Sequence, residues 1–98
     1  MPIYTAAESA EAAERCAATV ELIREGQDRT AVRNKGWLAL GYVQGVFSQE
    51  AISPAVYSQF VRDIERVEAD RLAELQAAER HLAAEIQTIE DEMRAERD

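Results

Sequence analysis

The stretch that begins at Ser53-Pro54 constrains the fold more than any other part of the chain. Serine followed by proline is a helix start signal, because serine caps the first turn and proline fits the first helical position. After Pro54 the sequence contains no glycine and no further proline, and strong helix formers dominate it. We therefore expect one helix over about 54–97, roughly 65 Å long. Its apolar residues recur at helical spacing and share one broad face: Val56, Phe60, Ile64, Val67, Leu75, Leu82, Ile86, Ile89 and Met93.

Two shorter helices are expected before this long one. The first, over about 6–25, begins at a capping box in which Thr5 and Glu8 each satisfy a free backbone amide. We expect Gly26 to end that helix by adopting the left-handed conformation. The second helix, over about 29–47, has Asp28 or Thr30 as its cap.

The second segment contains three glycines that lower its helix propensity, Gly36, Gly41 and Gly45. Each costs up to about 1 kcal/mol relative to alanine in a helix interior. A strand over 37–47 is the alternative, but the chain offers no second strand to pair with it. We therefore predict a single domain over 1–98 that is all-α, an antiparallel bundle or hairpin of three helices with a long C-terminal helix.

The helix lengths leave part of the long helix without a neighbour. The two shorter helices are each about 30 Å long and cover only its first half. From Leu72 onward an apolar seam continues at the inner heptad positions, interrupted only by Glu79 and Glu96. This seam would be exposed to water in a single chain, so we expect it to pair with a second copy, as a homodimer, or with another protein. Its residues are Leu72, Leu75, Leu82, Ile86, Ile89 and Met93.

The composition excludes several classes of partner. The chain has 98 residues with 19 Asp or Glu against 11 Lys or Arg, a formal net charge of −8. Binding to nucleic acid by phosphate neutralisation, or to anionic membranes, needs a basic surface instead. A single cysteine forms no internal disulfide, and we find neither a secretory signal nor an apolar run long enough to cross a bilayer. We expect a soluble protein of the cytoplasm.

Acidic residues form a second stripe on the long helix, beside the apolar seam. They follow one another at steps of seven or four, with His81 between them: Asp63, Asp70, Glu74, Glu85 and Glu92. One interpretation is the solvated flank of a coiled coil, partly offset by neighbouring arginines. The other is a line of carboxylates that takes the place of phosphates in the basic groove of a partner. The surplus of acids favours this second interpretation, because an ordinary coiled-coil flank tends to balance its charges.

Other candidate sites have simpler interpretations. Gly41 and Gly45, together with Ala39, are spaced as a flat strip, which we expect to pack inside the bundle; docking of a partner helix is the alternative. Cys16 is expected to be a small core residue, because no basic neighbour activates it. His81 is expected at the surface, because the three or four converging ligands of a metal site are missing.

A basic cluster surrounds the first turn between helices. Interspersed acids make it too small a patch for nucleic acid, so we expect it to neutralise the last turn of the first helix or to pair with the acidic stripe of a neighbour. The cluster consists of Arg24, Arg29, Arg33 and Lys35.

No motif for phosphate binding, nucleophilic catalysis or zinc is present, so we expect a non-enzyme without cofactor or metal. Two functions remain. In the first, the chain is a small acidic binding protein that inhibits or modulates a larger complex that handles nucleic acid, and it is similar in size and charge to phage-encoded inhibitors of CRISPR systems. In the second, it is a structural or regulatory coiled-coil subunit that acts by oligomerisation. The excess of acids on the long helix, where 12 acids face 6 arginines from residue 61 onward, slightly favours the first.

Overall fold

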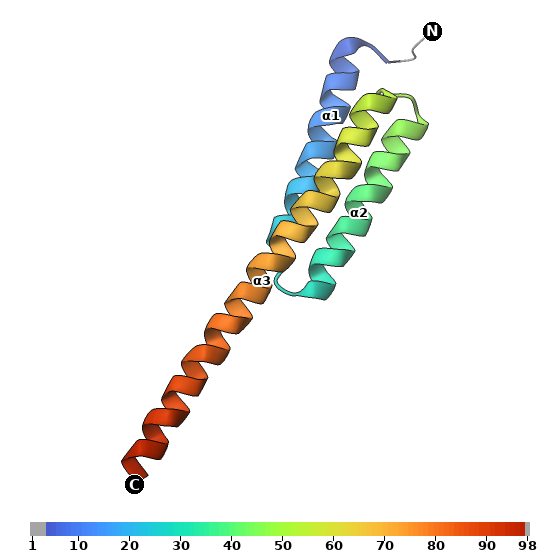
Figure 1. The fold of residues 1–98 in the computed structure, drawn as a ribbon. Helices are drawn as coiled ribbons and strands as arrows, with labels where there is room; N and C mark the ends of the chain where they lie inside the picture. The colour runs from blue at the N-terminus through green and yellow to red at the C-terminus, as the bar shows by residue number, and fades with distance from the viewer. Residues whose placement is uncertain (1–3, 98) are drawn as a thin grey trace.

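The chain folds into three helices, and the computed structural model describes residues 4–97. Helix α1 spans Ala6–Glu21 and continues into a single 3-10 segment, η1, at Leu22–Glu25; helix α2 spans Arg29–Ser48 and helix α3 spans Pro54–Arg97. The part of the chain that the structure describes contains no strand. Consecutive helices run antiparallel, with α3 longer than the other two (Figure 1). The all-α fold with a long C-terminal helix is confirmed.

Side-chain caps define where each helix begins. The amide of Glu8 donates to Thr5 Oγ1 at 3.1 Å, and the amide of Thr5 donates to Glu8 Oε1 at 3.2 Å, so the capping box forms. Asp28, rather than Thr30, caps α2, because its Oδ1 accepts from the amide of Ala31 at 2.8 Å. At the start of α3, the amide of Val56 donates to Ser53 Oγ at 3.2 Å.

The molecule is a slender rod because α3 extends far beyond the other helices. Its extents are 80 × 17 × 16 Å, and its radius of gyration is 20.6 Å, against about 13 Å for a globular domain of this length. Helices α1 and α2 lie against the first half of α3, and the second half, orange to red in Figure 1, projects alone.

The core lies between α1, α2 and the first half of α3. Its buried apolar side chains are Cys16, Val20, Ile23, Val32, Ala39, Val43, Ala51, Ile52, Ile64 and Val67. Leu72 and Leu75 also pack, partly buried, against this core. Residues 76–97 are all exposed, and we call them the projecting segment. The free part of the seam therefore begins after Leu75, one turn later than the expected boundary at Leu72, because the α1–α2 connection reaches that far along α3.

Gly26 ends the first helical stretch in a different way from the one expected. Its φ and ψ are −61° and 126°, which is extended backbone, so the prediction of a left-handed glycine was wrong. A glycine is needed there for space instead. A Cβ at this position would lie 2.6 Å from Cγ2 and 2.9 Å from the backbone nitrogen of Val32. The first turn of α2 therefore approaches the backbone at position 26 more closely than a residue with a Cβ would permit.

Glu50 lies in the turn between α2 and α3 and has a left-handed backbone conformation, with φ of 63°. No other residue in the described part of the chain has a positive φ. The amide of Glu50 donates to the carbonyl of Phe47 at 2.9 Å, and the amide of Ala51 donates to that of Val46 at 3.2 Å. These two bonds form a Schellman motif, the usual end of a helix at a glycine. The rings of Phe47 and Tyr57 stack across the turn with centroids 4.4 Å apart. The turn thus orients α3 against α2.

Candidate interaction surfaces

The projecting segment carries four large apolar side chains that nothing in the monomer covers. Their exposed fractions are 58% for Leu82, 48% for Ile86, 55% for Ile89 and 51% for Met93, and we call these four the exposed seam. On a helix of 100° per residue they all lie within about 40° of Ile64, a core residue of the same helix. The face of α3 that packs against α1 and α2 in the bundle therefore continues, uncovered, along the projecting segment.

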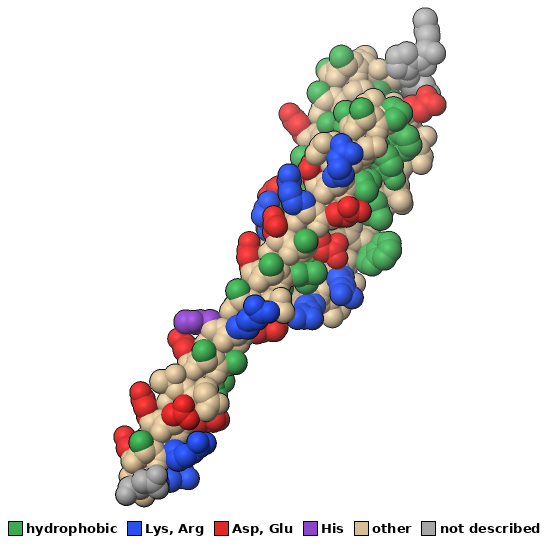
Figure 2. All heavy atoms as spheres, in the orientation of Figure 1, with side chains coloured by type: hydrophobic (Ala, Val, Ile, Leu, Met, Phe, Trp, Pro, Cys, Tyr) green, Lys and Arg blue, Asp and Glu red, His purple; other side chains and the backbone are tan. Residues whose placement is uncertain are grey.

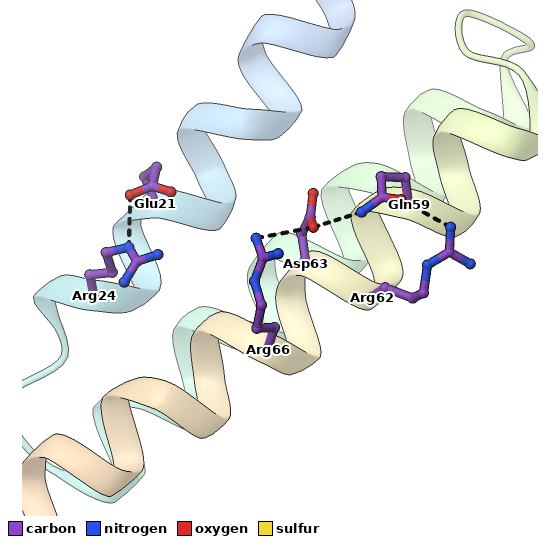
Figure 3. Close-up of polar contacts among 6 residues, drawn as sticks. All are labelled: Glu21, Arg24, Gln59, Arg62, Asp63 and Arg66. Carbon is purple, nitrogen blue, oxygen red and sulfur yellow. Dashed lines mark hydrogen bonds and ion pairs between the residues drawn. The ribbon is translucent and has the colours of Figure 1, made fainter.

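The acidic stripe lies to one side of this face, and the structure divides it into two parts. Asp63 belongs to the bundle half of α3, where its side chain is only 23% exposed. It accepts from Gln59 Nε2 at 2.9 Å and pairs with Arg66 at 3.2 Å, on the side of α3 that faces α1 in Figure 3. The other four members of the stripe, Asp70, Glu74, Glu85 and Glu92, are exposed. Asp63 is therefore poorly placed to be a free anion for a partner.

Two other members of the stripe also have partners within the chain. Glu74 accepts from Arg71 Nη1 at 3.0 Å, and Glu85 lies 3.0 Å from Nε2 of His81, which is 77% exposed as expected for a surface histidine. Within residues 4–97 no ion pair involves Asp70 or Glu92. The stripe thus combines paired and unpaired carboxylates rather than a uniform line of free anions.

The outer face of α2 is a second uncovered surface, and it contradicts an expectation. A Cβ at Gly41 or Gly45 would meet no atom within 4 Å, so these glycines do not pack inside the bundle, and that prediction was wrong. Trp37 and Leu38 are each 71% exposed beside them. Hydrophobic side chains gather over α2 in Figure 2. We call the surface made by Trp37, Leu38, Gly41 and Gly45 the outer face of α2.

The reason for the error is the helical phase of α2. Its buried positions are Val32, Gly36, Ala39 and Val43, spaced by four, three and four residues. Gly41 lies half a turn from Ala39, so the alanine packs in the core while the glycines face outward. The signal was present in the sequence, because Trp37, Gly41 and Gly45 recur at steps of four on a stripe of their own.

The two uncovered surfaces carry opposite charge. Helix α2 contains Arg29, Arg33 and Lys35 and no Asp or Glu, and none of these three forms an ion pair within residues 4–97. Arg24, the remaining member of the basic cluster, pairs with Glu21 at 2.9 Å. The projecting segment has six acids against three arginines. Its acids are Glu79, Glu85, Glu90, Asp91, Glu92 and Glu96.

The grooves and reactive side chains of the described residues bear on catalysis. One groove lies where α1 meets the α2–α3 turn, and Glu50 is the single titratable residue among its described lining residues. Cys16 is completely buried in the core, as expected, and burial raises the pKa of its thiol. Within residues 4–97, no group of three or more His, Cys, Asp or Glu is placed to hold a metal ion. None of the described helices is long and apolar enough to cross a membrane.

Comparisons with protein-family models, with curated proteins and with solved structures gave no match to this chain. The two uncovered surfaces and their charges are therefore the features of this chain that bear on its function.

Proposed function

We propose that the protein is a non-enzymatic binding subunit that acts by oligomerisation through the projecting segment of α3. The observation that carries this proposal is the exposed seam, four large apolar side chains in one line on the segment of α3 that no other helix covers. Contiguous apolar surface rimmed by charge is typical of a protein–protein interface. The groove at the α2–α3 turn, with Glu50 as the one titratable side chain among its described lining residues, offers no acid–base pair for catalysis.

The energetics of the projecting segment also favour a bound state. Fully burying a large apolar side chain contributes about 1.5–3 kcal/mol, so covering four that are half exposed contributes on the order of 4 kcal/mol. In proteins most of the stability of a helix comes from packing of its apolar face rather than from helix propensity, and the projecting segment has no such packing in the monomer. A partner that covers the seam supplies both contributions.

Sedimentation equilibrium tests this proposal with two matched variants. Leu82→Glu with Ile86→Glu places two charges in the exposed seam, whereas Ala77→Glu with Ala84→Glu places two charges on the opposite side of the same segment. We expect the wild type and the control with glutamate at positions 77 and 84 (the Ala variant) to have the mass of an oligomer. The variant with glutamate at positions 82 and 86 (the seam variant) should be monomeric. A wild-type monomer at tens of micromolar would exclude self-association.

Association with a different protein is tested by affinity capture from the native cells. A partner retained by the wild type and the Ala variant, and lost by the seam variant, supports the proposal. Equal retention by all three chains would contradict it.

A second candidate function uses the acidic stripe. Here the protein is a cytoplasmic inhibitor of a complex that handles nucleic acid, in the manner of the phage-encoded CRISPR inhibitors, and its carboxylates occupy a basic groove. The excess of 12 acids over 6 arginines from residue 61 onward favours it. Changing Asp70, Glu74, Glu85 and Glu92 to Gln should then abolish partner capture without changing helix content. Capture should also weaken steeply with salt, because exposed charges are screened over about 10 Å at 0.1 M.

A further inference from the structure

We propose that the projecting segment of one copy docks on the outer face of α2 of a second copy, and that this contact is made twice in a closed two-fold dimer. This inference rests on the proposed function and specifies the partner of the exposed seam. The partner surface is Trp37, Leu38, Gly41 and Gly45, which the monomer leaves open.

The continuity of the apolar face of α3 leads to this arrangement. In the bundle, α2 covers part of that face, and beyond Leu75 the same face continues without cover. A second copy that runs in the opposite direction brings its own α2 beside the projecting segment. Each α2 then lies between two long helices: its inner face packs on its own α3 and its outer face on that of the second copy. The two contacts are identical, so the assembly closes and leaves no seam uncovered.

The lengths of the two surfaces match. Helix α2 has 20 residues, which is about 30 Å at 1.5 Å per residue. The projecting segment, residues 76–97, is about 33 Å long by the same rise. The second copy's segment therefore covers α2 from end to end and extends little beyond it.

The shapes of the two surfaces are also complementary. Gly41 and Gly45 leave a shallow strip along α2, because no side chain rises from either position and no other group lies within 4 Å of where a Cβ would be. The large side chains of the exposed seam fit such a strip. Trp37 lies at the start of the same stripe and Leu38 lies beside it, and both supply exposed apolar contact area.

Charge complementarity favours this contact over pairing of two projecting segments with each other. On the projecting segment one flank of the seam is uniformly acidic, with Glu85, Glu92 and Glu96, and the other carries Glu79 and Glu90 beside Arg94 and Arg97. Two such segments paired through their acidic flanks would bring like charges together, which is unfavourable. On α2, Arg33 and Lys35 flank the outer face on opposite sides and have no acidic partner in the described chain.

The arrangement also fixes a direction. Helix α2 runs antiparallel to its own α3 (Figure 1), and the second copy is reversed, so the second copy's projecting segment runs parallel to α2. Its Glu79 and Glu85 then lie toward the basic start of α2, and its Met93 lies toward Gly45.

A charge-swap experiment tests this contact. One variant carries Arg33→Glu and Lys35→Glu on α2, and the other carries Glu79→Lys and Glu85→Lys on the projecting segment. All four positions lie outside the core, and circular dichroism checks that helix content is unchanged. We expect each variant alone to dimerise at least about tenfold more weakly than the wild type. An equimolar mixture should regain wild-type affinity as a heterodimer, since one contact is reversed in sign and the other is native.

The outcomes separate this inference from the proposed function. If the wild type dimerises and the α2 variant dimerises with the same affinity, the inference is overturned, because the exposed seam then pairs with another surface. Oligomerisation through the projecting segment would still stand. A wild type that remains monomeric also overturns it, and the capture experiment then decides the proposed function. Recovery in the mixture supports the inference.

A second variant tests the contact by filling the strip on α2 and changes no charge. Gly41→Gln with Gly45→Gln adds side chains where the monomer has open space, so the fold is retained. We expect this variant to lose the dimer because the strip on α2 is filled. Dimerisation at wild-type affinity would overturn the inference.

Discussion

The guanidinium of Arg71 is tied to the backbone of Gly26, since its Nε donates to the glycine carbonyl oxygen at 2.9 Å across 45 positions of sequence. The arginine side chain is only 20% exposed, and its Nη1 also reaches Glu74. Gly26 lies in the connection between η1 and α2. The bond therefore holds that connection against α3 at the point where α3 leaves the bundle.

Loss of this bond should be measurable. Arg71→Met keeps much of the apolar stem but leaves the partly buried carbonyl of Gly26 without its donor, so we expect a loss of about 1–2 kcal/mol in the free energy of unfolding. Arg66→Met is the control, because Arg66 is 64% exposed and its ion pair with Asp63 should contribute less than about 1 kcal/mol. Urea unfolding measures both. Equal losses in the two variants would show that the bond to Gly26 has no special weight.

Glu50→Gly should stabilise the protein. Glu50 has φ of 63°, in the left-handed region that favours glycine, at the end of α2. We expect a gain of up to about 1 kcal/mol, because removal of the Cβ strain outweighs the added freedom of the unfolded chain. The neighbouring Gln49 has φ of −84°, so Gln49→Gly should give no gain. Thermal unfolding compares the two variants, and a lower midpoint for Glu50→Gly would contradict the prediction.

The glycines of the chain should respond oppositely to alanine. Gly26→Ala places a Cβ 2.6 Å from Cγ2 of Val32 and close to its backbone, so we expect a loss of about 1–3 kcal/mol. Gly41→Ala meets no neighbour in an exposed helix interior and should stabilise the monomer by roughly 0.5–1 kcal/mol. Chemical unfolding at a concentration where the protein is monomeric measures each effect. A tolerated Gly26→Ala would show that the connection can move away from Val32.

Hydrogen exchange should divide α3 into two parts. In the monomer, amides of the projecting segment should exchange rapidly, because a helix without packing opens locally. Amides around Ile64 and Val67 in the same helix should exchange slowly, since these residues are buried in the core. Raising the protein concentration should protect the projecting segment as the seam becomes covered. Slow exchange along all of α3 in the monomer would contradict this prediction.

The sequence was sufficient to predict the three helices and most of their limits, because local chemistry sets them. Thr5, Asp28 and Ser53 each cap a helix where an oxygen-bearing side chain precedes good helix formers. The C-terminal helix was predicted over its whole length for the same reason. The change to a 3-10 segment over Leu22–Glu25, at the end of the first helical stretch, was not predicted.

The faces of the helices were harder to predict. Helix α2 has two stripes of small and apolar residues, and the sequence does not say which of them packs inward. The structure buries Ala39 and exposes Gly41, which reverses the expected role of the glycines. Asp63 is likewise partly covered because α1 lies beside it, and the position of α1 depends on packing between distant segments. Local pattern therefore predicts elements, while exposure depends on tertiary contacts.

Because α3 is one unbroken helix, the distance of the exposed seam from the bundle also sets its angular position about the helix axis. Between Val56 and Arg97 there is neither glycine nor proline, so bundle and seam share one rod without a hinge. Whatever binds near Met93 is held at a set azimuth relative to Trp37 as well as at a set reach. One residue added after Gln76 would turn the seam by about 100° about the rod and move it by only about 1.5 Å. An addition of seven residues would nearly restore the phase while lengthening the rod by about 10 Å. A change in the length of α3 therefore alters the angular position of a bound partner about the helix axis far more than its distance from the bundle.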